Sequence, residues 1–331
     1  MTISFRGWMR ESIDHIRDGD RDLAARLARP AYYLWVGAFL TYSHWSTYGS
    51  NIFDSDWDLL VVLDTCRVDA MEAVADEYDF IESVDSRTSV GSTSFEWMNH
   101  TFTTDYSTKI KETAYITQNA FTSRVLNGGY TGQTAIPFGP SEYDTVRYED
   151  FGYLEDLWEA EFSDDSEWTV SSNVLSRVHP RYATERTIRA GRERDTDRLA
   201  VHYMYPHDPY VLSSEKLQPR FSDALKDGTA SREEAWEAYL DHLRFVLDEV
   251  ELLLKNVDAE QVAITADHGE AFGEYGFYHH PVACPLSCVR EVPWVETTAT
   301  DTESLRPTAP HPESTLTTAN VEDRLAELGY R

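Results

Sequence analysis

The chain has 331 residues and a formal net charge of −29, from 58 acidic residues against 29 basic ones. The acidic residues are spread along the whole length, which excludes a nucleic-acid scaffold, because a phosphate backbone attracts basic surfaces. The length is typical of one α/β enzyme domain with additions rather than of two independent domains.

The composition also bears on the environment of the protein. Only five of the residues are lysines, and dense carboxylates keep a protein soluble where molar salt screens their repulsion. We therefore expect a halophilic protein, with an acidic mesophilic protein as the alternative. The three cysteines, Cys66, Cys284 and Cys288, cannot form a full set of disulfide pairs, so we expect a reducing, cytoplasmic location.

The first predicted unit is a helical N-terminal extension, residues 1–50, in which Pro30 is expected to break or restart the helix. Residues 30–45 (PAYYLWVGAFLTYSHW) form the one long apolar and aromatic run of the chain. A helix that spans a membrane needs about twenty apolar residues, so this run is too short to span one. Two interpretations remain: a helix packed on the main domain, or peripheral membrane contact through residues 30–45.

The main domain, residues 51–331, carries short apolar segments separated by stretches long enough for helices. Ser231 with Glu234 is typical of a helix start, and apolar residues then recur at helical spacing through Leu254. Residues 125–195 are polar and predict a substrate-facing insertion. The alternation predicts an α/β fold, a doubly wound, mostly parallel sheet with helices on both faces. The expected strands are residues 57–64, 113–118, 199–205 and 261–267.

Polar residues follow two of these strands directly. Asp64 ends the first apolar run, and Asp267 with His268 ends the last. Because the carboxyl ends of parallel strands meet at one edge of a sheet, these side chains are candidate ligands of a divalent metal, Mn, Zn, Mg or Ca. Gly269 then allows a close turn of the backbone.

Six segments carry a resemblance to the alkaline phosphatase and sulfatase superfamily. They occur in the order that the family has, and together they cover most of the chain from about residue 50 onward. DHG within the fourth segment is the most specific element. The segments are LVVLDTCRVDAM (60–71), VGSTSFEW (90–97), HYMYPHDPY (202–210), TADHGEAFGE (265–274), REVPWVE (290–296) and EDRLAELGY (322–330).

The resemblance assigns metal binding to Asp64, Asp267 and His268. The Cys/Ser-x-Pro-x-Arg motif of formylglycine sulfatases does not occur in this sequence. Residues 90–97 are instead similar to the nucleophile segment of phosphoglycerol-transferring relatives. We therefore favour Thr93 as the catalytic nucleophile, with Ser92 and Ser94 as alternatives, and Ser92 is also a candidate substrate contact.

Other residues implied by the resemblance surround the transferred group. His207 and His280 are expected to be catalytic, and His279 and Arg67 to bind substrate. For Arg67 a structural ion pair is an equal alternative. We favour one tightly held metal, because residues 202–207 lack the Asp that accompanies the early His of two-metal relatives. A second metal remains an alternative.

The resemblance implies a metal-dependent hydrolase of phosphate or sulfate esters that works through a covalent intermediate on a hydroxyl nucleophile. Its substrate would be a small-molecule ester or a glycan or lipid ester. The absence of the formylglycine motif favours phosphorus over sulfur as the transferred centre. One alternative is a transferase that moves a phospho-alcohol group onto a glycan or lipid, and another is a non-catalytic protein that binds a ligand at a degenerate site.

Overall fold

The computed structural model describes residues 2–17, 23–46, 48–127, 135–158 and 160–312. The segment 322–330, which resembles a family ending, lies outside the described residues. The strands are β1 Thr2–Ile3, β2 Leu59–Leu63, β3 Asp85–Thr88, β4 Thr113–Thr117, β5 Ala135–Ile136, β6 Tyr153–Asp156, β7 Thr169–Ser171, β8 Ser176–Val178, β9 Arg198–Tyr203, β10 Ala259–Thr265, β11 Ala271–Phe272, β12 Tyr278–His279 and β13 Glu291–Ala299. The α-helices are α1 Phe5–Arg17, α2 Leu23–Trp45, α3 Val68–Val74, α4 Ser94–Thr101, α5 Ser107–Lys111, α6 Phe121–Leu126, α7 Pro180–Glu193, α8 Phe221–Asp227, α9 Arg232–Leu254 and α10 Ser287–Arg290.

A seven-stranded sheet in the order β3-β13-β10-β2-β9-β4-β6 forms the centre of the molecule. The strands β10, β2, β9, β4 and β6 run parallel to one another. The strands β13 and β3 extend the sheet with antiparallel pairing. All four strands expected from the sequence lie in this sheet, and the prediction of a mostly parallel α/β sheet is confirmed.

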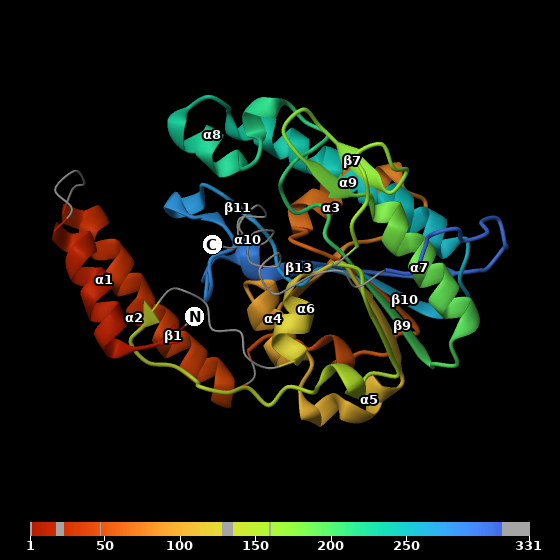
Figure 1. The fold of residues 1–331 in the computed structure, drawn as a ribbon, viewed down its shortest axis with the longest axis horizontal. Helices are drawn as coiled ribbons and strands as arrows, with labels where there is room; N and C mark the ends of the chain where they lie inside the picture. The colour runs from red at the N-terminus through yellow and green to blue at the C-terminus, as the bar shows by residue number, and fades with distance from the viewer. Residues whose placement is uncertain (1, 18–22, 47, 128–134, 159, 313–331) are drawn as a thin grey trace.

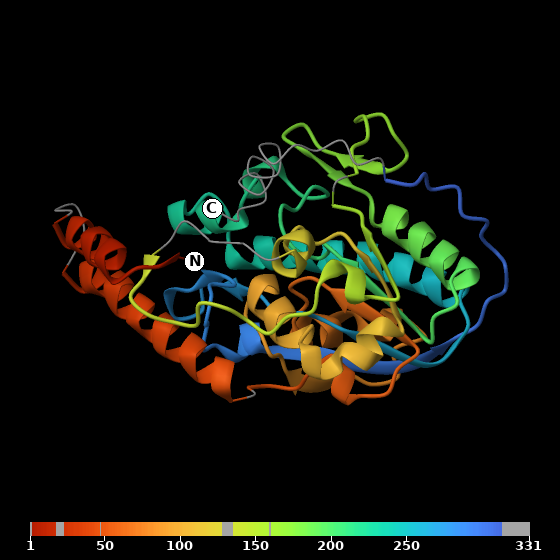
Figure 2. The same cartoon turned by 60° about the horizontal axis from the view of Figure 1, so that its bottom comes forward.

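Helices cover both faces of the sheet because its central strand is apolar on both sides. Leu59, Val61 and Leu63 of β2 belong to the core cluster that contains residues of α3, α7 and α9. Leu60 and Val62 belong to the cluster that contains residues of α4, α5 and α6. The two groups of helices are seen on opposite sides of the sheet in Figures 1 and 2. This pattern is typical of a parallel sheet buried on both faces.

The longest helix of the body, α9, begins where the sequence predicts. The Ser231 hydroxyl accepts a hydrogen bond from the Glu234 amide at 3.1 Å, and the Glu234 carboxylate accepts one from the Ser231 amide at 2.8 Å. This reciprocal pair is a capping box, which satisfies two amide groups at the start of a helix. The cap holds the N-terminal end of a helix whose buried side runs through Leu254.

The N-terminal extension forms two helices, α1 and α2, which lie side by side at one end of the molecule (Figures 1 and 2). The expected break at Pro30 is wrong, because Pro30 lies inside the continuous helix α2. A proline removes one backbone hydrogen bond, but packing holds the helix on its C-terminal side. Tyr32 Oη donates to the Val282 carbonyl at 2.7 Å, and Trp35 Nε1 donates to the Ala283 carbonyl at 2.8 Å. No helix of the described residues is both long and apolar enough to cross a membrane.

The region 125–195, expected as an insertion, divides into parts with different positions. The strand β6 joins the edge of the main sheet, and the helix α7 packs against α9 and β9. The strands β7 and β8 pair only with each other and form a separate hairpin. The hairpin therefore stands apart from the main sheet, as does β5, which pairs with β1.

A buried ion pair joins the edge strand β6 to α7 and leads to a stability prediction. Arg186 donates to the Glu155 carboxylate at 2.6 and 3.0 Å, and both side chains are less than 5% exposed. We expect Glu155→Gln to lower the free energy of unfolding by about 3–5 kcal/mol, because it leaves the Arg186 charge buried without its counter-ion. Urea unfolding followed by circular dichroism measures this change.

The matched control is the exposed pair between Arg244 and Glu77. Glu77→Gln should change the free energy of unfolding by no more than about 1 kcal/mol, because water screens a surface pair. An equal loss of unfolding free energy in the two variants would show that the buried Glu155 pair stabilises the protein no more than the exposed Glu77 pair does.

Candidate metal-binding active site

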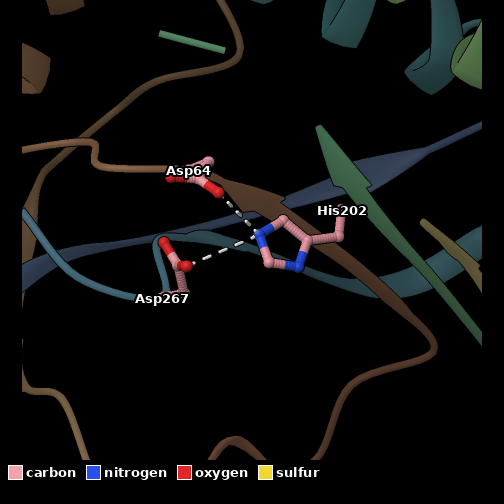
Figure 3. A group of neighbouring side chains, drawn as sticks. All are labelled: Asp64, His202 and Asp267. Carbon is pink, nitrogen blue, oxygen red and sulfur yellow. Dashed lines mark ion pairs between the residues drawn. The ribbon is translucent and has the colours of Figure 1, made fainter. Parts of the chain in front are cut away.

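Three neighbouring parallel strands deliver acidic and imidazole groups to one edge of the sheet. Asp64 follows the last residue of β2, Asp267 comes two residues after β10, and His202 lies near the end of β9. Because β10 and β9 are the two parallel partners of β2, the three side chains meet at the carboxyl end of the sheet. Figure 3 shows the His202 ring directed between the two carboxylates.

The three side chains could hold one cation together. His202 Nε2 lies 3.7 Å from Asp64 Oδ2 and 3.7 Å from Asp267 Oδ2. One ligand atom from each residue lies within 4.8 Å of the others, and all three residues are fully buried. Two carboxylates and an imidazole form a mixed set of oxygen and nitrogen ligands that suits Mn, Zn or Mg.

The electrostatics of this group also fit a bound cation. Burial, followed by the negative charges of Asp267 and Glu270, raises the pKa of Asp64 well above its ordinary value. Asp64 Oδ1 is buried and has no hydrogen-bond partner among the described residues. A divalent ion would balance the two charges and satisfy this oxygen. Burial lowers the pKa of His202 to about 4, so its imidazole is neutral, as a metal ligand must be.

His268, the third predicted ligand, lies beside Asp267, outside the group of Asp64, His202 and Asp267 whose ligand atoms lie within 4.8 Å of one another. Its Nε2 is 3.3 Å from Asp267 Oδ2. Its Nδ1 is 3.0 Å from the Gly269 carbonyl, to which it donates when the ring carries its proton there. That tautomer leaves the Nε2 lone pair on the side of the Asp267 carboxylate, as metal ligation requires. Burial, followed by the His280 charge, lowers the pKa of His268 and keeps the ring neutral.

The structure distinguishes the three hydroxyls at the start of α4. Ser94 Oγ lies 2.7 Å from Asp267 Oδ2, 3.4 Å from Asp64 Oδ2 and 3.4 Å from His268 Nε2. The Thr93 hydroxyl caps the helix and accepts from the Glu96 amide at 3.1 Å. The Ser92 hydroxyl lies 3.1 Å from both the Glu96 carboxylate and the Pro281 carbonyl, and it donates its one proton to either of them. Of the three, Ser94 is therefore the one whose hydroxyl contacts the predicted metal ligands.

Asn119 is a site residue that the sequence interpretation missed. Its Nδ2 donates to Asp64 Oδ2 at 2.8 Å and to Ser94 Oγ at 2.9 Å. The position two residues after the end of β4 was its sequence signal, because polar residues after parallel strands gather at the same edge. His202 was missed as a ligand because it lies inside an apolar strand, where a buried histidine resembles a packing residue.

The backbone around Asp267 is shaped to hold this carboxylate. Asp267 Oδ1 accepts hydrogen bonds from the Thr65 amide at 3.2 Å and from the His268 amide at 2.9 Å. Thr65 has a φ of 66°, a left-handed conformation that is unfavourable for a residue with a branched side chain. The Tyr239 hydroxyl of α9 donates to the Thr65 carbonyl at 2.8 Å and accepts from the Arg67 amide at 2.9 Å.

Two glycines allow the segments of the site to approach one another. A Cβ on Gly269 would lie 2.1 Å from the Cys288 carbonyl oxygen, and a Cβ on Gly91 would lie 2.3 Å from the Trp97 amide nitrogen. Both distances are shorter than any carbon contact, and both obstacles are backbone atoms. The turn after His268 and the approach to α4 therefore require glycine.

The predicted catalytic histidines lie next to the metal ligands. The His280 ring centroid is 4.4 Å from that of His268 and 5.0 Å from that of His207. His280 Nδ1 lies 3.4 Å from the Glu270 carboxylate. Burial is the largest cause that lowers the pKa of both His207 and His280, and burial raises the pKa of Glu270 to about 8.

A second group of possible ligands lies beside this one. Asp208, Glu270 and His279 each offer an atom within 4.8 Å of the others. His279 Nδ1 is 3.9 Å from each of the two carboxylates, and its Nε2 is 2.7 Å from the Ser222 hydroxyl. The sequence interpretation found no acidic partner for a second metal within residues 202–207. In the structure, Asp208 and Glu270 offer such carboxylates, so the alternative of a second metal has a set of candidate ligands.

Arg67 lies in a network of ion pairs. Its guanidinium donates to Asp69 at 2.6 and 2.8 Å, to Glu274 at 2.9 Å and to the Glu270 carbonyl at 3.0 Å. The same group lies 5.0 Å from the ring centroid of Trp236. These contacts occupy the donors of the guanidinium, and they favour the structural alternative over substrate binding.

The metal site makes a prediction about stability with and without metal. Chelated protein should gain about 2.7 kcal/mol of unfolding free energy when Mn²⁺ or Zn²⁺ is added at roughly a hundred times its dissociation constant. Asp64→Asn should abolish this gain and should make the metal-free protein more stable, because it removes a buried carboxyl group whose ionised form is unfavourable in this position. Urea unfolding and equilibrium dialysis of the metal provide the measurements.

Asp69→Asn is the control, because Asp69 is an acid of the adjacent helix that pairs with Arg67. It should keep the full gain on metal addition. If the metal stabilised Asp64→Asn as much as the unsubstituted protein, Asp64 would not be a ligand.

Comparisons with known proteins were made for sequence and for structure. No family model matches the chain, and no curated protein matches it. The solved structures that match include the periplasmic domain of phosphoethanolamine transferase EptC from Campylobacter jejuni, at 16% identity and a TM-score of 0.41, with 72% of this chain and 77% of that chain covered. The soluble domain of lipooligosaccharide phosphoethanolamine transferase A from Neisseria meningitidis matches at 15% identity and a TM-score of 0.43, covering 74% and 77%.

A putative sulfatase from Bacteroides thetaiotaomicron matches at 11% identity and a TM-score of 0.40, with 82% of this chain and 70% of that chain covered. TM-scores in this range carry no inference about activity, which must come from the residues of the site.

Proposed function

We propose that the protein is a metal-dependent hydrolase of phosphate esters with Ser94 as its nucleophile. The observation that carries this proposal is the position of Ser94 Oγ, within 3.4 Å of Asp64, Asp267 and His268. Ser94 replaces Thr93, the residue favoured from the sequence, because the Thr93 hydroxyl is engaged in the helix cap. The absence of a formylglycine motif supports phosphorus rather than sulfur as the transferred centre.

The residues around Ser94 prepare its hydroxyl for attack. Ser94 Oγ donates to Asp267 Oδ2, which can draw the proton away, and it accepts from Asn119 Nδ2, which stabilises developing negative charge. Ser94 is the first residue of α4, and the amide groups at a helix start favour the anionic oxygens of a phosphoryl group. A bound divalent ion would supply a fixed positive charge for the same oxygens and lower the pKa of the hydroxyl.

The reaction then proceeds through two displacements. The Ser94 oxygen forms a bond to phosphorus while the bond to the alcohol oxygen breaks, and the alcohol leaves with a proton from His207 or His280. These rings are neutral when buried, and an incoming phosphate anion raises their pKa so that they can carry that proton. Water next attacks the phosphoserine and releases phosphate. An acceptor hydroxyl in place of water would make the protein a transferase, the second candidate.

Substitution of the two neighbouring hydroxyls tests the nucleophile. Ser94→Ala should lower kcat for a chromogenic phosphate ester by roughly 10³-fold or more, because the covalent step needs this oxygen. Thr93→Ala should retain most of the activity and lose about 1 kcal/mol of stability, since it removes only a helix cap. Phosphate monoester, diester and sulfate substrates are compared in molar salt, with Mn²⁺, Zn²⁺ or Mg²⁺ added after chelation.

Mass spectrometry after an acid quench provides a second readout, with phosphate expected on Ser94 alone. An inactive Thr93→Ala together with an active Ser94→Ala would return the role to Thr93. Activity on sulfate alone would exclude phosphorus as the transferred centre.

We propose a cytoplasmic location in a halophile, with peripheral contact to a membrane through α2. The three cysteines are free, in agreement with a reducing compartment. The exposed face of α2 is apolar from Leu27 to Trp45. The exposed residues on this face are Leu27, Ala31, Leu34, Trp35, Ala38, Tyr42 and Trp45.

Charge supports a lipid surface as the partner of this face. Residues 1–45 carry six arginines against five acidic residues, a net charge of +1, so the remaining residues carry −30 of the total −29. An anionic lipid surface would therefore meet the least repulsion at this extension. Tryptophan and tyrosine, three of the seven exposed residues, are the side chains that favour the boundary between lipid and water.

Flotation with liposomes that contain anionic lipid tests this contact. Leu34→Asp should reduce the bound fraction by roughly tenfold, because it puts a charge into the face that enters the lipid. Leu212→Asp is the matched control, since Leu212 is 46% exposed and Leu34 is 43% exposed. Equal binding by both variants, or no flotation of the unsubstituted protein at any salt concentration, would exclude this surface.

A further inference from the structure

A pocket with a volume of about 510 Å³ lies at the carboxyl ends of the parallel strands β4, β6 and β9. Its walls come from the ends of β4, β6 and β9, from the β7–β8 hairpin, and from the segment before α8. The hairpin contributes five consecutive residues, Val174–Val178. This volume is typical of pockets that hold a small organic molecule.

Two lining residues link the pocket to segments that carry site residues. Gln118 lines the pocket and immediately precedes Asn119, whose amide donates to both Asp64 and Ser94. Arg177 lines the pocket and donates to the carbonyl of His207. A molecule in the pocket would therefore lie against the segments that hold Asn119 and His207.

The chemistry of the wall is unusual for so acidic a chain. The described lining residues include no aspartate and no glutamate, although the chain contains 58 acidic residues. Apolar side chains form most of the surface. They include Leu157, Trp158, Val174, Leu175, Val178 and Met204.

The charged groups that line the pocket are two arginines. The buried Arg177 guanidinium donates to the carbonyls of Met204, His207 and Pro209 at 2.6 to 3.0 Å. Neither Arg177 nor Arg220 forms an ion pair with a carboxylate of the described residues. Positive charge that has no carboxylate partner, beside an apolar wall, favours an anion with an apolar body, and it disfavours an amino alcohol, whose ammonium group would find no carboxylate.

We propose that this pocket binds the alcohol part of the substrate, and that this part is an uncharged alkyl chain. The substrate class is then an alkyl phosphate, a phosphorylated lipid-like alcohol. The inference rests on the proposed function for the identity of the reacting group, whereas the pocket itself can be tested by binding alone. Attack by Ser94 Oγ breaks the bond between phosphorus and the alkyl oxygen, and the alcohol leaves the pocket with a proton from a histidine.

The test compares methyl, butyl and octyl phosphate as substrates, with release of inorganic phosphate as the readout. Each buried methylene contributes roughly a factor of three to four, so kcat/KM should be at least about tenfold higher for octyl than for methyl phosphate. Val174→Asp should lower this ratio by about tenfold. Leu212→Asp, which changes an aliphatic residue of equal exposure outside the pocket, should keep the ratio.

Binding of methyl and octyl phosphonate, which have no cleavable ester bond, is measured by calorimetry on the same metal-loaded proteins. Arg220→Gln should weaken octyl phosphonate binding several-fold, because it removes one of the two cations. This variant gives a second readout if Val174→Asp disturbs the hairpin.

The outcomes distinguish a failure of the pocket assignment from a failure of the proposed hydrolase reaction. Cleavage of all three esters at one rate, with equal binding of both phosphonates, would overturn the pocket assignment and leave the hydrolase proposal intact. Tighter binding of octyl phosphonate without cleavage of any ester would support the pocket and remove the proposed reaction. Preference for an aminoethyl phosphate over octyl phosphate would also overturn the assignment.

Discussion

The structure depends on the burial of two carboxylates, Asp64 and Asp267, at the ends of the adjacent parallel strands β2 and β10. Two buried negative charges side by side are unfavourable unless hydrogen bonds or a cation compensate them. Backbone amides at Thr65 and His268 compensate Asp267, and the Asn119 amide compensates Asp64 in part. The remaining charge is the physical reason to expect a divalent ion.

The surrounding elements hold the segments that meet at this point. Tyr239 of α9 fixes the strained turn at Thr65. Glu96 of α4 joins three segments, because it accepts from the Ser92 amide, from the Ala283 amide and from Arg290 at the end of α10. The helix α4, the turn after β2 and the loop that carries His279 and His280 are thus tied to one another. An open α/β sheet allows this, since the strand ends converge while the loops stay free to vary.

Two surfaces of the protein differ in charge from the rest of the chain: the lining of the pocket and the exposed face of α2. Carboxylates cover the chain almost everywhere, but the described lining of the 510 Å³ pocket contains none, and the exposed face of α2 contains none. Each of these two surfaces combines apolar side chains with nearby arginines. The same physical argument therefore leads to a lipid-like alcohol for the pocket and to a lipid surface for α2.

The sequence by itself predicted the parallel strands, the long helix α9 and the candidate metal ligands Asp64, Asp267 and His268, because apolar runs, a capping box and acids at strand ends are local patterns. The tertiary structure favours Ser94 over Thr93, since adjacent side chains at a helix start point in different directions and the placement of α4 brings the Ser94 hydroxyl beside Asp267. It also added His202 and Asn119, brought together by strand pairing across large separations in the chain. The pocket and the exposed face of α2 depend in the same way on which segments pack side by side, and no local pattern encodes that.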